Sequence, residues 1–523
     1  MSAASVGEWA AVRGLGNIRA PTFVATQSSD PGSHQISALC DSYNGKEFFV
    51  TTHLSNPALL SLVDQSTLET VLAAALRTGG DFAEVFVEDR VNSSALLDDG
   101  RVEELTSGAE RGAGIRVIRG DTTGFAHTAD LSEAGLLAAA VAAGAAARGG
   151  AGGVRSVNLT DRSRPRPHPV LVDPIAIPKS RKVELLQRGD SAARAAGAAI
   201  RQVTVGYGDA RRRILVANSD GVLAGDETVR TRLMVQAVAL GDTGMQTGYD
   251  VAAKTVGWEL FDEYDVEEIG RKAAQRALTK LRARPAPSGK VTVVLEKGAG
   301  GTMFHEACGH GLEADLVMKD TSVFRNRVGQ QVAARGVTIV DDGSYAREWG
   351  TSAIDDEGNA TQRNVLIEDG VLTDYMWDLR HAKKHGHAPS GNGRRQSYQY
   401  LPIVRMTNTY LLAGAEEPGS IVAGTESGIY CAKLGGGQVN TATGDFVFGM
   451  VEAYLIENGQ ITEPLRDANL IGNGPAVLQA IDAIGNDFAT GVGTCGKDGQ
   501  GVPVSDGNPT LRVQGITVGG TAA

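Results

Sequence analysis

The chain has 523 residues, and its 50 Lys and Arg against 61 Asp and Glu give a formal net charge of −11. That charge argues against a protein that holds nucleic acid or an anionic membrane surface through bulk electrostatics. A hydrophobic fraction of 42% with 21% charged residues is ordinary for a globular protein and excludes a disordered, collagen-like or coiled-coil chain. The 67 glycines and the aromatic content of only 5% indicate many turns and close backbone contacts.

The cysteines indicate a protein of a reducing compartment, and the apolar runs indicate that it does not span a membrane. Cys40, Cys308, Cys431 and Cys495 are too few and too scattered for a disulfide framework in a chain of this size. The longest apolar run, residues 135–147, is shorter than the roughly 18 to 20 residues that a membrane span requires. The first residues lack the basic start and apolar stretch of a secretory signal. We therefore expect a cytoplasmic protein.

Residues 1–53 are rich in Ser, Thr, Gly and Pro without a sustained apolar period, so we expect a loosely ordered N-terminal extension. Beyond it, Ser66 and Glu69 form a capping box that opens a helix, and residues 82–88 alternate as a half-buried strand does. The pattern predicts an N-terminal α/β domain over residues 54–285, with helices on a sheet. Its expected helices are residues 66–76, 132–148 and 179–196, and its expected strands include residues 114–118 and 201–205.

A domain boundary is expected at residues 285–289, where Pro-Ala-Pro-Ser-Gly ends a Lys- and Arg-rich helix over residues 267–284. The second part, residues 286–523, is predicted to be a mainly antiparallel β domain that carries one metal-binding helix. Its expected elements are strands at residues 291–296 and 336–340, a hairpin at 364–375 turning at 368–370, and a hairpin at 446–462 turning at 457–459. The fold class expected for the chain is α+β.

That helix contains two histidines and a glutamate within residues 304–313, which read Phe-His-Glu-Ala-Cys-Gly-His-Gly-Leu-Glu. In the common zinc-protease pattern the histidines are four residues apart, about 40° around a helix, whereas His305 and His310 would be about 140° apart on a regular helix. A local widening to π geometry would bring both rings to one face, and Gly309, flanked by Gly311, would supply the backbone freedom. The alternative is an ordinary helix N-terminus with a capping Glu and two hydrogen-bonded histidines.

A catalytic zinc needs three protein ligands and one position for water, so a third ligand must be found. Glu313, Asp315 and Cys308 are close in sequence, although a small buried cysteine such as Cys308 more often serves packing. The remaining candidate is Cys495, which lies in a glycine-rich segment with little apolar sequence around it. The neighbouring Lys497 could favour its thiolate form, and the alternative is an exposed free thiol.

Two further patterns compete for a functional role. His381 and His385 have the i, i+4 spacing of a metal site and are followed by His387, but a solvated basic face explains this segment equally well. Residues 435–439, Gly-Gly-Gly-Gln-Val, lack the Lys-Ser/Thr ending of a phosphate-binding loop. Their bare backbone is expected to approach a ligand or another strand.

Several segments together resemble the TldD branch of the TldD/PmbA metalloprotease family, and the match extends from about Leu54 to the C-terminus. These segments are residues 304–313, 353–358, 391–395, 405–410, 435–439, 452–459 and 495–500. The resemblance implies a zinc-dependent peptidase in which His305, His310 and Cys495 bind the metal and Glu306 is the catalytic base. It also implies a two-part subunit in a dimer, with a PmbA/TldE-type partner that lacks the metal motif or with a second copy of the chain.

The chemistry expected from these roles is peptide hydrolysis without a covalent intermediate, in which Glu306 takes a proton from the attacking water and passes it to the leaving amine. If residues 435–438 form a strand edge near the metal, an extended peptide can add to it through main-chain hydrogen bonds, which favours broad action on unfolded peptides. The substrate-binding candidates are therefore Gly435, Gly436, Gly437 and Gln438. Candidate oxyanion donors, each of which can equally fix a hairpin, are Tyr430, Arg394, Arg395 and Asn408.

Two other functions stay open from the sequence. The first is a non-catalytic regulatory or protein-binding subunit, of the kind suggested by the older family name, modulator of DNA gyrase. The second is a zinc hydrolase acting on a substrate other than a peptide, since the activation of water is common to both reactions.

Overall fold

The structure is a computed structural model that describes residues 36–43, 46–52, 62–147 and 155–521. The chain divides into two compact units, residues 1–55 and residues 56–523. In the first unit the described residues form an antiparallel hairpin of β1 (Ile36–Tyr43) and β2 (Lys46–Thr52). The rest of the extension expected over residues 1–53 lies outside the described residues.

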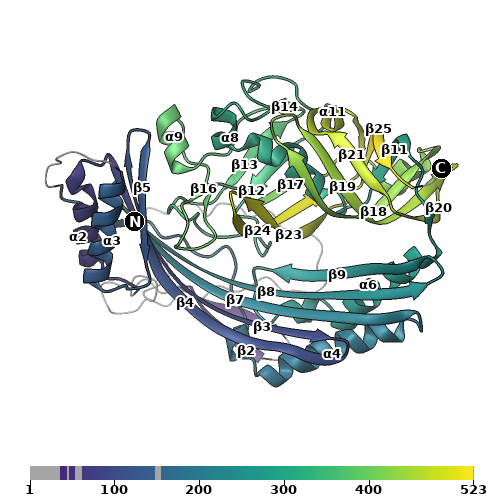
Figure 1. Cartoon of the computed structure of the whole chain (residues 1–523), viewed down its shortest axis with the longest axis horizontal. Coiled ribbons are helices and arrows are strands. Elements are labelled where there is room, and N and C mark those ends of the chain that lie inside the picture. Colours follow the sequence, from purple (N-terminus) through teal and green to yellow (C-terminus); the bar gives the residue numbers. More distant parts are fainter. Residues whose placement is uncertain (1–35, 44–45, 53–61, 148–154, 522–523) are drawn as a thin grey trace, which may run out of the picture. The chain divides into compact units, whose positions relative to one another are not determined.

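A sheet of long strands forms the first part of the second unit (Figure 1). Its strands are β3 (Phe82–Asp98), β4 (Arg101–Arg119), β5 (Thr122–Thr128), β6 (Thr160–Asp161), β7 (Ile200–Asn218), β8 (Val222–Gly241) and β9 (Gly244–Lys254). The order is β5-β4-β3-β7-β8-β6, with β9 also paired to β8, and every pairing except β6 with β8 is antiparallel. The strands expected at residues 82–88, 114–118 and 201–205 are parts of these longer strands. Their extensions carry small and charged residues that interrupt the apolar alternation while the backbone ladder continues.

Helices cover one face of this sheet and leave the other for the second half of the chain. The helices are α2 (Gln65–Ala75), α3 (Glu133–Ala146), α4 (Lys179–Ala195), α5 (Leu260–Glu263) and α6 (Val266–Arg282), with 3-10 turns at Leu76–Thr78 and Pro174–Ala176. Val85 and Leu97 of β3 belong to the cores beneath these helices. Phe86, which directly follows Val85, lies on the opposite face of the strand and packs with Ile354 and Tyr398 of the second half. One face of β3 therefore packs against the helices, and its other face packs against the second half of the chain.

Helix α2 begins at a different cap from the one that the sequence predicts. Asp64 is the N-cap residue, because its Oδ1 accepts the backbone N–H of Thr67 at 2.8 Å. Ser66, the expected cap, lies inside the helix and donates its hydroxyl to Asp64 at 2.6 Å. A carboxylate is the stronger acceptor at this position. Glu69, the expected second member of the box, accepts instead from the backbone N–H of Leu159 at 3.1 Å.

The second half is rich in strands and contains a closed barrel. The strands of this half are β10 (Arg284–Pro285), β11 (Gly289–Leu295), β12 (Ile339–Asp342), β13 (Arg363–Glu368), β14 (Val371–Leu372), β15 (Gly393–Arg394), β16 (Ile403–Val404), β17 (Asn408–Leu411), β18 (Ser427–Asn440), β19 (Asp445–Glu457), β20 (Gln460–Arg466), β21 (Asn469–Asn473), β22 (Ile481–Ile484), β23 (Ala489–Lys497), β24 (Gln500–Asn508) and β25 (Leu511–Gly519). In the barrel, β19, β18, β11, β25 and β21 pair in this order, and β21 also pairs with β19, which closes the ring. A separate six-stranded sheet has the order β14-β13-β12-β17-β24-β23.

Short helices complete this half, and the mixed α+β class is confirmed. They are α7 (Gly301–Phe304), α8 (Ala314–Met318), α9 (Leu379–His385), α10 (Pro418–Ala423) and α11 (Gly474–Gln479). Both predicted hairpins are present, β13 with β14 and β19 with β20. Their turns place Asp369 and Gly370, and Asn458 and Gly459, at positive φ, the conformation that these residue types tolerate best. In the part of the chain that the structure describes, no helix is both long and apolar enough to cross a membrane.

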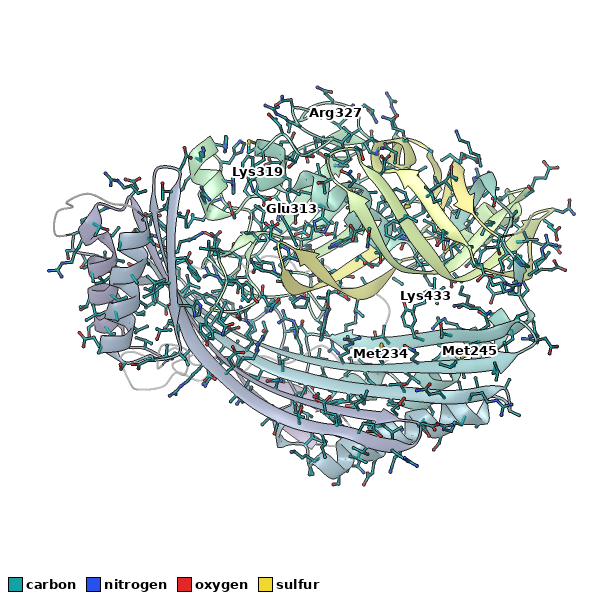
Figure 2. The ribbon with its side chains drawn as sticks, in the orientation of Figure 1. Met234, Met245, Glu313, Lys319, Arg327 and Lys433 are labelled. Carbon is teal, nitrogen blue, oxygen red and sulfur yellow. The ribbon has the colours of Figure 1, made fainter. Side chains whose placement is uncertain are left out.

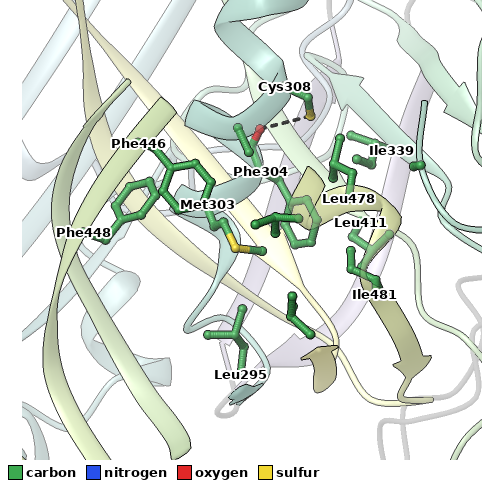
Figure 3. Close-up of a cluster of buried hydrophobic side chains, with 14 of the residues drawn as sticks. Leu295, Met303, Phe304, Cys308, Ile339, Leu411, Phe446, Phe448, Leu478 and Ile481 are labelled. Atoms are coloured by element: carbon green, nitrogen blue, oxygen red, sulfur yellow. Dashed lines mark hydrogen bonds between the residues drawn. The ribbon is translucent and has the colours of Figure 1, made fainter. Parts of the chain in front are cut away.

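The apolar core of the second half surrounds α7. Met303 and Phe304 are fully buried next to Phe446 and Phe448 of β19 (Figure 3). Because α7 is anchored on this side by large apolar side chains, the residues that follow it are fixed in direction.

Buried ion pairs join the long-stranded sheet to the second half. Arg116 of β4 contacts Glu84 of β3 at 2.7 Å and Glu357 at 2.8 Å. Arg395 also contacts Glu84, and all four side chains are almost completely buried. Such pairs are sensitive to geometry, because a misplaced partner leaves a buried charge uncompensated.

Candidate metal centre

The histidine motif follows β11 and α7 and adopts the π geometry that its spacing predicts. Residues His305–Gly309 form a π turn, in which the backbone N–H of His310 donates to the carbonyl of His305. Residues His310–Leu312 continue as a 3-10 turn. The sequence-based prediction of a local π widening is therefore confirmed, and both imidazoles reach the same side.

The reason for the glycines in the motif differs from the expected one. Gly309 has φ −53° and ψ −57°, a conformation open to any residue. A Cβ at this position would lie 2.1 Å from Sδ of Met406, and one at Gly311 would lie 2.7 Å from the ring of Phe324. The glycines are needed for close packing and not for backbone freedom.

Three buried side chains converge after this turn: His305, His310 and Cys495. Their candidate ligand atoms all lie within 4.8 Å of one another. The two imidazole rings are nearly perpendicular, at 88° with centroids 4.9 Å apart, and Sγ of Cys495 is 3.5 Å from Nε2 of His310. Across the described ranges, this is the one group of three His, Cys, Asp or Glu side chains with such a spacing.

Cys495 comes from a different element, the hairpin of β23 and β24. The turn of this hairpin places Asp498 and Gly499 at positive φ, and Cys495 pairs with Val502 across the ladder. The backbone carbonyl of Cys495 accepts a hydrogen bond from the guanidinium of the fully buried Arg405. The hairpin therefore presents its thiol from a firmly held backbone.

Glu313 orients one of the histidines. Its Oε2 lies 2.9 Å from Nδ1 of His310, which leaves Nε2 of that ring facing Cys495. The same oxygen accepts from Nζ of Lys497 at 2.9 Å, and Lys497 also donates to Asp315 at 2.7 Å. Glu313 and Asp315, which the sequence leaves open as third ligands, thus lie behind the cluster. Lys497 is occupied by these carboxylates and not by the thiol.

The electrostatics of the cluster favour a thiolate. Burial by itself would raise the pKa of Cys495, but the adjacent His305 and His310 rings lower it to about 4. Burial likewise works against protonation of His305, whose pKa is nevertheless raised by the Cys495 thiolate. Nδ1 of His305 is buried and has no hydrogen-bond partner among the residues that the structure describes. A thiolate with two imidazoles, one carrying such an orphaned nitrogen, is a donor set that fits zinc.

Glu306 lies beside the cluster in a cavity of about 740 Å³. The cavity is bounded by β9 and α6 on one side and by β18 and β23 on the other, and His305 and Asp506 also line it. Lys433 of β18 reaches Asp250 of β9 across this region, with Nζ 3.1 Å from Oδ1 (Figure 2). Burial raises the pKa of the Glu306 carboxyl. A raised pKa suits a group that must accept and return a proton near neutral pH.

Asp506 is the residue of this cavity that sequence reasoning misses. It is buried in β24, and its Oδ2 accepts the hydroxyl of Thr302 at 2.9 Å. Burial raises the pKa of Asp506. Its segment, Ser505-Asp-Gly-Asn508, has the composition of a turn, so no local signal places it in a strand.

The glycine segment expected near the metal lies in β18 and lines the same cavity. Gly437 packs so closely that a Cβ there would lie 2.0 Å from the ring of Phe448, whereas Gly436 faces free space. On one edge β18 pairs with β19 to its end, and on the other its pairing with β11 stops at Cys431. Among the described residues, the edge beyond Leu434 has no paired strand.

The oxyanion-donor candidates from the sequence, as far as the structure describes the chain, lie outside the lining of the cavity of Glu306. Arg394 is buried and donates to the carbonyl of Met406 at 2.6 Å, and Asn408 donates to the carbonyl of Asp342 at 2.7 Å. Together with Arg395 and Tyr430, these side chains are not among those lining the cavity of Glu306.

The rival histidines and Cys308 are likewise explained without a metal. Nδ1 of His381 lies 2.8 Å from Oδ1 of Asp378, and His387 stacks on Trp377 with ring centroids 4.2 Å apart. Cys308 donates its thiol to the carbonyl of Phe304 at 3.2 Å (Figure 3), and burial raises its pKa to about 12.

Comparison with known proteins gives consistent matches along most of the chain. Three family models match in order: the PmbA/TldA metallopeptidase domain 1 over residues 83–147, the central domain over 172–281 and the C-terminal domain over 288–520. The metalloprotease TldD homolog of Haemophilus influenzae is 36% identical over 478 residues, 90% of this chain and 97% of that protein. A metalloprotease of Methanothermobacter thermautotrophicus is 36% identical, over 84% of this chain and 96% of that protein.

Two further similarities add detail. The zinc metalloprotease TldD homolog of Saccharolobus solfataricus is 31% identical over 54% of this chain and 62% of that protein. Among solved structures, TldE from Thermococcus kodakarensis has a TM-score of 0.72 at 20% identity, covering 86% of this chain and 99% of that one, and shows the same fold. On the family models and the relatives above 30% identity, the chain belongs to the PmbA/TldD metallopeptidase family.

Proposed function

We propose that the chain is a zinc-dependent peptidase in which His305, His310 and Cys495 hold the metal and Glu306 is the general base. The observation that carries this proposal is the convergence of the three buried donor side chains, from two separate elements, within 4.8 Å beside a large cavity. When bound there, zinc supplies a Lewis acid that polarises a carbonyl oxygen and increases the acidity of water. The name of the Saccharolobus solfataricus relative supports zinc as the metal.

The protein's own groups divide the remaining work. Glu313 holds the ring of His310 with Nε2 toward the cluster, and Arg405 holds the backbone of Cys495. Glu306 takes a proton from the attacking water and delivers it to the leaving amine, a role that its place in the cavity and its raised pKa support. This is hydrolysis without a covalent intermediate.

The substrate proposed is an unfolded or flexible peptide. Gly435, Gly436, Gly437 and Gln438 belong to the edge of β18 that has no paired strand among the described residues, and the three glycines line the cavity. An extended peptide can add to such an edge through main-chain hydrogen bonds, largely independent of its side chains. Most backbone groups of a folded protein are already paired within its own structure, so an unfolded chain adds to this edge more readily.

A partner subunit belongs to the proposal as well. The fold shared with TldE of Thermococcus kodakarensis is consistent with a partner of the PmbA/TldE type, and a homodimer is the alternative. A cytoplasmic location also belongs here, because a free thiolate ligand persists best in a reducing compartment.

The test is zinc content and peptide cleavage, measured on the chain alone and after co-expression with a PmbA/TldE-type partner. We expect Glu306→Gln to retain zinc and lose hydrolysis of a flexible peptide, and Cys495→Ala to lose most of its zinc on dialysis. Glu463→Gln, at an exposed ion pair with Arg284, is the control and should keep both properties. Cleavage by zinc-free protein, or undiminished cleavage by Glu306→Gln, would refute this assignment. Zinc-loaded protein that cleaves no peptide in either arm would favour a regulatory function.

A further inference from the structure

A second pocket of about 430 Å³ lies between the long-stranded sheet and the β23–β24 hairpin. One wall comes from β3, β7 and β8, and the other from residues 394–396 and 501–503 with Thr494. Six of the lining residues are arginines and two are carboxylates, in a chain whose net charge is −11. The arginines are Arg90, Arg212, Arg230, Arg232, Arg394 and Arg395.

Both carboxylates of this arginine pocket are already paired. Asp209 accepts from Nζ of Lys182 at 2.6 Å and from the hydroxyl of Ser93 at 2.5 Å. Asp356 lies 2.8 Å from Nη1 of Arg212. Carboxylates outside the lining also pair with three of the arginines: Glu110 with Arg90 at 2.7 Å, Glu88 with Arg212 at 2.6 Å, and Glu84 with Arg395. Among the described residues, Arg230, Arg232 and Arg394 have no ion-pair partner, so the pocket keeps uncompensated positive charge at these three.

Two of the arginines bind only neutral oxygens. Arg230 donates from Nε to the carbonyl of Trp349 at 2.9 Å, and Arg394 donates from Nη2 to the carbonyl of Pro503 at 2.8 Å. No carboxylate within the described ranges forms an ion pair with either of them. Burial and the nearby guanidinium of Arg394 lower the pKa of Arg230 to about 9, and burial lowers that of Arg394 to about 10. Positive charges held this close together repel one another, and a bound anion would reduce that repulsion.

Arg232 and Arg212 add donors at the same place. Arg232 is exposed, and it donates from Nη2 to the weak acceptor Sδ of Met234 at 3.5 Å. Nη2 of Arg212 is buried, and within the described part of the chain it has no hydrogen-bond partner. Guanidinium groups match the planar, two-oxygen geometry of a carboxylate, which they bind through paired hydrogen bonds.

The arginine pocket adjoins the cavity of Glu306. Thr494 lines both, and the next residue is Cys495. In the sheet, Arg232 of β8 is the direct ladder partner of Ala253 of β9, which lines the cavity of Glu306. A peptide with its scissile bond in that cavity would meet the arginines on continuing past Thr494.

We propose that the arginine pocket binds a carboxylate of the peptide substrate while the scissile bond lies next to Glu306. This inference rests on the peptidase function proposed above. The carboxylate is either the free C-terminus of the peptide or the side chain of an Asp or Glu, since both present the same two oxygens. Main-chain pairing at β18 then accepts many sequences, while the arginine pocket selects peptides with a negative charge at one end.

The first experiment compares cleavage of three versions of one flexible peptide by the zinc-loaded protein. One version has a free C-terminus, the second is amidated, and the third is amidated but carries a single Glu moved along the sequence. We expect kcat/KM to be about 10- to 100-fold higher for a version whose carboxylate reaches the arginine pocket, the range typical of a charge-assisted hydrogen bond. The free C-terminus and the Glu series distinguish the two sources.

Variants then locate the effect. Arg232→Gln and Arg230→Gln should each reduce the preference for the carboxylate, and Arg201→Gln, at an exposed arginine of β7 outside the arginine pocket, should preserve it. Binding of the same peptides to the inactive Glu306→Gln protein, followed by calorimetry, should show the same preference in Kd. This readout does not depend on turnover.

Equal cleavage and equal binding of all three peptides by the wild-type protein would overturn the inference and leave the peptidase function standing. The absence of any cleavage would instead count against the peptidase function itself, and the calorimetry would still test the arginine pocket. Loss of dimerisation in Arg232→Gln, with an unchanged peptide preference, would assign the arginines to a subunit contact and overturn the inference.

Discussion

Replacing Lys497 with Met removes the ammonium group that connects the two sides of the candidate metal centre. Lys497 follows Cys495 by two residues on β23, and its Nζ is 2.9 Å from Glu313 and 2.7 Å from Asp315. Glu313 in turn holds Nδ1 of His310. We expect the variant to bind zinc more weakly, because the strand of Cys495 loses its tie to the turn of His310.

Two quantities set the size of the effect. The side chains of Lys497, Glu313 and Asp315 are only 7%, 0% and 4% exposed, and breaking a buried ion pair from one side costs about 3 to 5 kcal/mol of stability. Asp315 offsets part of this cost by binding a proton, since burial already raises its pKa, so we expect about 3 kcal/mol. Loss of a partner behind a metal ligand weakens metal binding about 10- to 100-fold, and we expect the zinc Kd to rise within that range.

The assay is zinc affinity by competition with a chromophoric chelator, together with urea unfolding of the metal-free protein. Lys433→Met is the matched control, because Lys433 is also ion-paired in a partly buried site, 3.1 Å from Asp250, but does not contact the metal cluster. The control should keep its zinc Kd while losing some stability. An unchanged zinc Kd in Lys497→Met, with lowered stability, would show that the lysine supports only the fold.

Two further outcomes follow from contacts elsewhere. Gly309→Ala places a Cβ 2.1 Å from Sδ of Met406, so we expect a loss of about 1 to 3 kcal/mol in urea unfolding from overpacking, and a wild-type value would contradict the packing argument. His168 bridges the carbonyl of Thr255 and, through Nδ1, the backbone N–H of Arg347 at 3.1 Å, and burial lowers its pKa. Its contribution to stability is therefore present above about pH 6.5 and is lost as the pH falls below it. His168→Asn should flatten this part of the stability profile, and an unchanged slope between pH 5 and 7 would assign it to other groups.

Local rules predict the parts of this fold in which the chain contacts itself at short range. The turns at Asp369-Gly370 and Asn458-Gly459 follow from the few residue types that tolerate positive φ. The π turn follows from the five-residue spacing of the two histidines, since a regular helix would separate them. In the two hairpin turns one or two residues decide the backbone conformation, whereas the π turn also depends on close packing of Gly309 against Met406.

The rest depends on contacts that no local pattern records. The true cap of α2 is Asp64 because its carboxylate competes successfully with the hydroxyl of Ser66, and the spacing rule does not rank the two. Asp506 lies in a strand although its neighbours have turn composition. The residues alone leave Cys495 as one candidate ligand beside Glu313 and Asp315, and only the resemblance to a family singles it out.

The third candidate ligand depends on a register that the hairpin turn sets. Cys495 comes 185 residues after His310. The pairing of β23 with β24 fixes which side chains of β23 face the histidines. Side chains alternate along a strand, so a slip by one residue would turn Cys495 away, and Lys497 with it, because both point to the same side. Asp498 and Gly499, at positive φ, favour one register, and the ion pairs of Lys497 with Glu313 and Asp315 penalise the slipped one. The lysine thus protects the position of the thiol even though the two side chains do not pair with each other.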